Sequence, residues 1–179
     1  YDTSSIVSAK KSESKIASEK IEDTFGASNQ LVVMVPKGNY ESEAKILKKL
    51  ENLDYVNSVL GLANVSINDD YILTDKLNPR QFAELTDLDV EIVQVLYTAY
   101  AYHEEQYGPV FTGIDDYEVP IIDMFLFLYD QYKEGYVTLD KDLDEKLTTL
   151  YDTLHDAQLQ LQGDEYSRFV LDLSLPVEG

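Results

Sequence analysis

The spacing of apolar residues along the chain predicts a strand followed by a helix in its first third. The uninterrupted apolar run Leu31–Val35 is closed by Pro36 and is typical of a central strand buried on both faces. Apolar residues then recur at intervals of three and four positions, which predicts a helix over roughly residues 41–53. Asn39 or Ser42 could cap the start of this helix, because both side chains can accept a hydrogen bond from the first turn.

A second strand is predicted after this helix, and the last part of the chain adds a long helix and a further strand. Residues 55–67 are rich in Val, Ile and Leu and predict a second strand, with Gly61 as a bulge or bend. Gly163 stands where a long helix is expected to end, and residues 169–175 largely alternate between apolar and polar, which predicts a strand with one buried face. The helix before Gly163 is predicted from an apolar stripe: Leu139, Leu143, Leu147, Leu150, Leu154, Ala157 and Leu161.

The middle of the chain is predicted to be helical. Pro79 suits the first turn of a short helix that contains Phe82 and Leu85. A third helix is expected over residues 120–133, and its apolar residues run almost all round, so it must be central or covered by something outside the chain. A longer helix, ended by Gly108-Pro109, is expected between these two, with its apolar residues on one side: Ile92, Val93, Leu96, Tyr97 and Tyr100.

The fold class predicted from this order is α+β, with a helical insertion. Residues 16–67 and 139–179 are expected to form an α+β core, and residues 68–138 are expected to form the insertion. Residues 1–15 are rich in Ser and Lys and are interpreted as an N-terminal arm, followed by a short helix that ends at Gly26. Because the chain begins at Tyr1 and not at Met, we expect it to be a piece of a longer protein.

Charge restricts the classes of partner. The 179 residues carry a formal net charge of −20, and the acidic residues are concentrated after residue 50. Nucleic acid and anionic membrane surfaces are therefore poor partners, because both require basic charge. The acidic region is interpreted either as a solvated surface or as a vestibule that concentrates cations. The absence of Cys excludes disulfides, thiolate catalysis and Cys-type zinc sites.

Motifs for catalysis and for metal binding fail at defining positions. His103-Glu104-Glu105 resembles the start of a zinc-protease motif, but Tyr107 replaces the second His. The acidic run that begins at Asp140 resembles a calcium loop, but Glu145 and Tyr151 replace its required Gly and Glu. The loop acids Asp115, Asp116 and Glu118 are a weaker candidate for cation binding. We therefore assign no catalytic, cofactor-binding or metal-binding residue, and we expect a protein that is not an enzyme and has no cofactor.

Tyrosine is the unusual feature of the composition, with 14 Tyr against 6 Phe and no Trp. Its rings can line a core edge with their hydroxyl groups in water, or they can form an amphipathic contact surface. Both interpretations remain open. The residues predicted as a substrate or partner surface are Tyr97, Tyr100, Phe125, Phe127, Leu128, Tyr129 and Tyr132.

Three short segments together carry a family resemblance. They are Phe25-Gly26-Ala27-Ser28-Asn29 leading into Leu31–Pro36, Tyr55-Val56-Asn57-Ser58-Val59, and Tyr166-Ser167-Arg168-Phe169-Val170-Leu171 leading into Leu175–Gly179. With them, the chain resembles the first extracytoplasmic loop of bacterial MMPL-type transporters of the RND superfamily. The resemblance covers about residues 12–179 and is weakest over residues 70–135. It implies a ferredoxin-like porter subdomain, in which a small antiparallel or mixed sheet carries helices on one face.

The resemblance also implies a function and a location. The chain would be part of a proton-driven exporter of lipids or drugs, on the extracytoplasmic side of the cell membrane. It would not itself span the membrane but would pack on the second porter loop and on the membrane helices. It would shape the path of an amphipathic or hydrophobic substrate, and an acidic surround would favour a cationic substrate over an anionic one. Two alternatives are a free-standing secreted ligand-binding or adhesion domain and an acidic hydrolase with unrecognised carboxylates.

Overall fold

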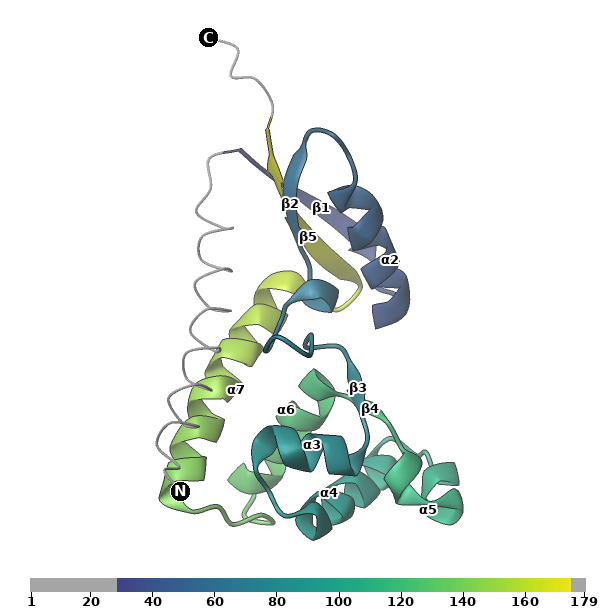
Figure 1. Ribbon diagram of the computed structural model, residues 1–179, viewed down its shortest axis with the longest axis vertical. Coiled ribbons are helices and arrows are strands. Elements are labelled where there is room, and N and C mark those ends of the chain that lie inside the picture. The colour runs from purple at the N-terminus through teal and green to yellow at the C-terminus, as the bar shows by residue number, and fades with distance from the viewer. Residues whose placement is uncertain (1–28, 175–179) are drawn as a thin grey trace. The chain divides into compact units, whose positions relative to one another are not determined.

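The structure is a computed structural model that describes residues 29–174, and it has an α+β fold (Figure 1). The predicted fold class is confirmed at this level. The chain divides into two compact units, of which unit 2 is Asp75–Leu147 and unit 1 contains the described residues before and after it. The predicted insertion, residues 68–138, thus begins and ends several residues earlier than unit 2. The predicted arm and first short helix lie outside the described residues.

Unit 1 contains an antiparallel sheet of three strands, β1 (Gln30–Pro36), β2 (Val56–Leu60) and β5 (Tyr166–Leu173). The strand order is β1-β5-β2, so β5 is the central strand and β1 lies at an edge. The prediction that residues 31–35 form a central strand is therefore wrong. An apolar run indicates a strand, but its position in the sheet depends on which partner strand pairs with it. β5 pairs on both sides and buries both of its faces at Phe169 and Val170.

Helix α2 (Tyr40–Glu51) packs beside the sheet of unit 1 (Figure 1). Its predicted cap is confirmed for Asn39, whose Oδ1 accepts a hydrogen bond from the backbone N–H of Ser42 at 2.8 Å. Residues from this helix, the strands and the turn after β2 share one apolar cluster: Leu47, Val56, Val59, Ala63, Phe169 and Leu171.

The second predicted strand is shorter than expected. β2 ends at Leu60, and Leu62–Asn64 form a 3₁₀ turn, because the Asn64 side chain organises the backbone around it. Asn64 Oδ1 accepts a hydrogen bond from the Gly61 N–H at 2.9 Å, and Asn64 Nδ2 donates to the Val59 carbonyl oxygen at 2.8 Å. Gly61 is not the bulge, since the irregular pairing lies between Val56 and Ser58. It is instead a point of close packing, where an added Cβ would lie 2.8 Å from Leu47 Cδ2.

Unit 2 is mainly helical, and a short two-stranded sheet joins its segments. The strands are β3 (Lys76–Leu77) and β4 (Val119–Pro120). The helical elements are α3 (Pro79–Thr86), α4 (Val90–His103), α5 (Gly108–Thr112), η2 (Ile114–Asp116) and α6 (Ile121–Lys133). The helix expected at Pro79 is confirmed, and Asn78 and Gln81 form a reciprocal capping box at its start.

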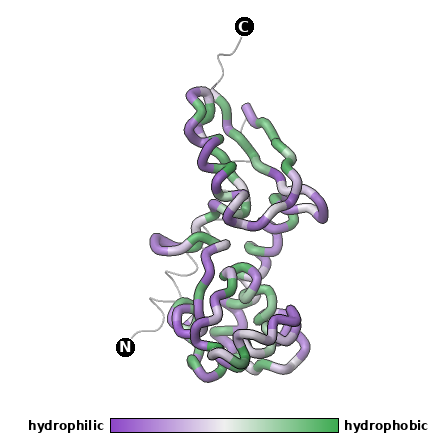
Figure 2. Tube along the Cα trace, turned by 90° about the vertical axis from the view of Figure 1, so that its right-hand side faces the viewer, coloured by the Kyte–Doolittle hydropathy of each residue, from purple (hydrophilic) through white to green (hydrophobic). Residues whose placement is uncertain are grey.

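Helix α6 buries side chains around most of its circumference, as the all-round apolar pattern of residues 120–133 predicted. Its buried residues are Ile121, Ile122, Met124, Phe125, Phe127, Leu128 and Tyr129. Apolar segments occur in both units of the chain (Figure 2). None of the helices in residues 29–174 combines the length and the apolar character needed to cross a membrane.

Helix α7 (Lys141–Leu161) follows the predicted apolar stripe, with Leu147, Leu154, Ala157 and Leu161 buried. Its start is fixed by Asp140, whose Oδ1 accepts a hydrogen bond from the Leu143 N–H at 2.9 Å. The acidic run that resembled a calcium loop therefore begins at a helix cap. Beyond the helix, Gly163 belongs to the turn into β5, where its N–H donates to the Tyr166 carbonyl oxygen at 2.7 Å.

Candidate functional site

The predicted tyrosine-rich surface is largely the interior of the protein. Tyr97 has 0% of its surface exposed, and Phe125, Phe127, Leu128 and Tyr129 are also buried. Tyr100 and Tyr132 are partly exposed. The prediction of an exposed patch is therefore wrong for five of the seven residues. The physical reason is that α4 and α6 contact each other within unit 2, so the apolar sides that were assigned to a partner are used within the chain.

Three of the four ring pairs that connect Phe82 with Phe127 are arranged edge to face, and the fourth, between Tyr100 and Tyr117, is tilted by 37°. The ring centroids of Phe82 and Tyr97 lie 5.9 Å apart, and those of Tyr100 and Phe127 lie 5.3 Å apart. Tyr117 joins the two pairs, because its centroid lies 6.2 Å from that of Tyr97 and 6.5 Å from that of Tyr100. Edge-to-face pairs at these separations are favourable beyond the area that they bury. The tyrosines therefore hold unit 2 together.

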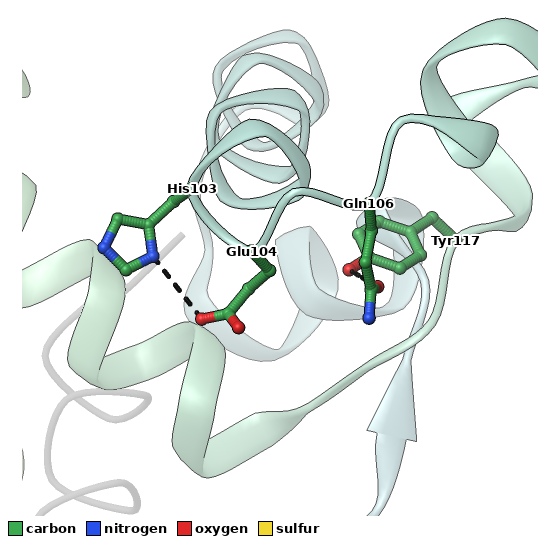
Figure 3. Close-up of polar contacts among 4 residues, drawn as sticks. All are labelled: His103, Glu104, Gln106 and Tyr117. Atoms are coloured by element: carbon green, nitrogen blue, oxygen red, sulfur yellow. Dashed lines mark hydrogen bonds and ion pairs between the residues drawn. The ribbon is translucent and has the colours of Figure 1, made fainter.

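The polar groups beside this aromatic cluster are drawn in Figure 3. His103 Nδ1 lies 3.4 Å from Glu104 Oε1, and the Tyr117 hydroxyl donates to Gln106 Oε1 at 2.7 Å. Burial, followed by the charge of Glu104, raises the pKa of the Tyr117 hydroxyl above its ordinary value. His103 and Glu104 are both exposed. These contacts explain the positions of the four side chains, and we assign them no catalytic role.

One of the three loop acids that were candidates for cation binding makes a structural hydrogen bond. Asp115 lies in η2 and accepts a hydrogen bond from Gln94 Nε2 at 2.7 Å, which ties this loop to α4. Within residues 29–174, no cluster of three or more His, Asp or Glu side chains is arranged to hold a metal ion.

An exposed apolar surface lies on the opposite side of α4, where the sequence pattern did not place it. Four residues of α4 and two that follow it define what we call the α4–α5 surface: Ile92, Val95, Ala99, Tyr102, Tyr107 and Phe111. Val95 is 70% exposed and Phe111 is 85% exposed. Ile92, which belongs to the apolar side predicted for this helix, is 42% exposed. The four α4 residues are spaced by three, four and three positions, so they share one face of the helix.

The other side of α4 is packed against the rest of unit 2. Val93, Leu96, Tyr97 and Ala101 are the buried residues of α4, and the helix contacts α3, α5, α6 and η2. The helix ends at His103, before the predicted Gly108-Pro109 stop, and these two residues instead begin α5. The rings of Tyr102 and Tyr107 lie 5.6 Å apart, which connects the face of α4 with the segment that leads into α5. The exposed apolar side chains of α4 therefore belong to a helix whose opposite side is packed within unit 2.

Acidic residues flank the α4–α5 surface in the sequence, and the neighbouring sequence has no Lys or Arg. From Gln81 to Tyr132 there are eleven Asp and Glu and no Lys or Arg. Glu91 lies one helical turn before Val95, and Glu104 and Glu105 follow Tyr102 at the other end of the stripe. All three of these acidic residues are exposed. The surface thus has an apolar centre and exposed acidic residues near its two ends, and these three acids are called its acidic rim.

Comparison of the chain with protein-family models, with curated proteins and with solved structures finds no match.

Proposed function

We propose that the chain is an extracytoplasmic porter domain of a proton-driven RND/MMPL-type exporter of lipids or drugs. In this role the domain performs no catalysis. It packs on the second porter loop and the membrane helices of the same transporter, and it shapes the path of an amphipathic or hydrophobic substrate. A ferredoxin-like arrangement of unit 1 belongs to the same proposal.

The observation that carries the proposal is the order of the elements along the chain, in which unit 2 interrupts the sequence of unit 1. A strand, a helix and a strand precede the helical unit. Helix α7 begins in unit 2 and continues into unit 1, and a strand follows it. This is the order that the sequence resemblance implied. Two of the resembling segments correspond to strands in this sheet, since Leu31–Pro36 lies in β1 and Tyr166–Leu171 lies in β5. The exposed apolar surface of unit 2 suits packing between parts of a larger protein.

The location can be tested because the chain contains no Cys. In the complete reading frame that encodes this chain, with any other Cys removed, Tyr136→Cys places one thiol at a 75% exposed position outside the α4–α5 surface. A membrane-impermeant maleimide is expected to label this thiol in intact cells. A matched Leu73→Cys variant, at a 1% exposed position, is expected to remain unlabelled until the protein is denatured. Labelling of Tyr136→Cys only after the cells are permeabilised would contradict an extracytoplasmic location.

Transport can be tested in the same cells. Expression of the complete protein is expected to lower the accumulation of an amphipathic fluorescent dye, and a protonophore is expected to abolish this effect. A variant that lacks residues 75–147 is the internal comparison, and its membrane level is checked by immunoblot. Recovery of the labelled protein from the culture medium would instead support the free-standing secreted domain.

A further inference from the structure

We propose that the α4–α5 surface docks an amphipathic helix of a partner protein, and that the apolar stripe of this helix is flanked by Lys and Arg. The proposal concerns the chemistry of the partner and does not require that the chain belongs to an exporter. It rests on the shape of the exposed stripe, on the charge around it and on the packed residues behind it.

The spacing of the exposed residues favours a helix as the partner. Ile92, Val95, Ala99 and Tyr102 recur at intervals of three and four residues, which is the pattern of a face that packs against another helix. Ala99 is the smallest side chain of the four and leaves room for a large apolar side chain of the partner between Val95 and Tyr102. Phe111 and Tyr107 extend the apolar area beyond one helix face. Exposed apolar areas that are bordered by polar residues are typical of protein contact sites.

The charge of the rim determines which helix fits. Glu91, Glu104 and Glu105 are exposed at the two ends of the stripe, and no Lys or Arg lies between Gln81 and Tyr132. Basic residues beside the partner's apolar stripe would therefore meet opposite charge, which steers association and suppresses acidic partners. A second copy of the chain would bring the same acidic rim against itself. An anionic membrane surface would be repelled for the same reason.

The test uses the whole chain and a designed helical peptide labelled with fluorescein. The peptide carries Leu at heptad positions a and d and Lys at positions e and g. Two control peptides have the same Leu positions with Glu in place of Lys, or the same composition with scrambled order. Fluorescence anisotropy is expected to show saturable binding of the Lys peptide alone, and binding should weaken as salt rises.

Substitution of Val95 separates docking from simple charge attraction. Val95→Asp adds negative charge, so charge attraction alone would strengthen binding of the Lys peptide. Docking on the apolar stripe predicts the opposite, a loss of about tenfold or more in affinity, because an apolar contact is replaced by a buried charge. Leu159→Asp in α7 is the matched control, since Leu159 is a helical apolar residue that is 60% exposed and lies outside the surface. It is expected to change the affinity by less than about twofold.

Several outcomes would overturn the proposal. One is binding of the Glu peptide or the scrambled peptide with the same affinity as the Lys peptide. Another is an unchanged or higher affinity of the Lys peptide for Val95→Asp, when circular dichroism shows that this variant is folded. Sedimentation of the chain with anionic vesicles would assign the surface to a membrane. A dimer that Val95→Asp dissociates would assign it to a second copy of the chain. Because Val95 is 70% exposed, folding of the variant is not expected to limit the experiment.

Discussion

The hydroxyl group of Tyr97 donates a hydrogen bond to the backbone carbonyl oxygen of Leu77 at 2.8 Å, and both side chains are buried. This contact joins α4 to β3, two elements that are separated in the chain by α3. Burial raises the pKa of the Tyr97 hydroxyl well above its ordinary value, and the nearby Tyr117 and Glu118 act in the same direction. The neutral hydroxyl is therefore a structural group in the interior of unit 2.

Replacement of Tyr97 by Phe is expected to lower the free energy of unfolding by roughly 1–3 kcal/mol, because the Leu77 carbonyl oxygen loses a buried hydrogen-bond donor. The ring and its contact with Phe82 are retained in this variant. Urea denaturation followed by circular dichroism measures the change. Tyr136→Phe is the control, since Tyr136 is 75% exposed, and it is expected to have little effect. Equal stability of the two variants would show that the Tyr97 hydrogen bond contributes nothing.

The same residue predicts a dependence on alkaline pH. The pKa of Tyr97 is raised in the folded state from an ordinary value of 10.0, so its contribution is fully present below pH 10. Above that pH the unfolded chain loses the proton first, and stability falls by up to about 1.4 kcal/mol for each pH unit. Wild type and Tyr97→Phe are therefore expected to become more similar in melting temperature between pH 9 and pH 11. A constant difference across this range would argue against the raised pKa.

A methyl group at Gly61 is expected to destabilise unit 1. The Cβ of an alanine would lie 2.8 Å from Leu47 Cδ2 and 2.9 Å from Phe169 Cδ1, both on buried residues. Gly61→Ala should therefore cost roughly 1–3 kcal/mol through overpacking. Gly108→Ala is the matched control, because an added Cβ there meets nothing within 4 Å. Comparable melting temperatures for both variants would show that the Gly61 site can relax.

The capping box at α3 gives a third stability test. Asn78 Oδ1 accepts from the Gln81 N–H at 2.9 Å, and Gln81 Oε1 accepts from the Asn78 N–H at 3.0 Å. Asn78→Ala is expected to lower stability by about 1 kcal/mol, whereas Asn78→Asp keeps the acceptor and should retain most of it. Denaturant melts of the two variants measure the difference. Equal losses would show that the side-chain acceptor is not the stabilising group.

Salt is expected to stabilise the chain. The net charge is −20, and ions screen the repulsion among exposed carboxylates. The melting temperature should rise as sodium chloride increases from low to physiological concentration at neutral pH. A variant with Asp69→Asn and Asp70→Asn, two adjacent exposed acids, should respond less steeply. A melting temperature that falls with salt would contradict this expectation.

The sequence predicts the helices well because their signals are local. The cap at Asn39, the proline at the start of α3 and the leucine stripe of α7 each act within a few residues of chain. The strand order could not be predicted, because an apolar run such as β1 is consistent with a central or an edge position. The sequence assigns the aromatic residues to the correct helices, but it predicts an exposed surface where the structure buries five of the seven residues. Both sides of α4 are apolar, and only its contacts with other elements show which side is covered.

The central position of β5 has a consequence for synthesis on the ribosome. β1 and β2 end at residues 36 and 60, but the strand that pairs with both begins at residue 166. Unit 2 is one continuous segment, so it can fold before β5, the middle strand of the sheet of unit 1, has been synthesised. The two early strands therefore remain in the nascent chain with unpaired edges, which is the state most exposed to misfolding and to chaperone binding.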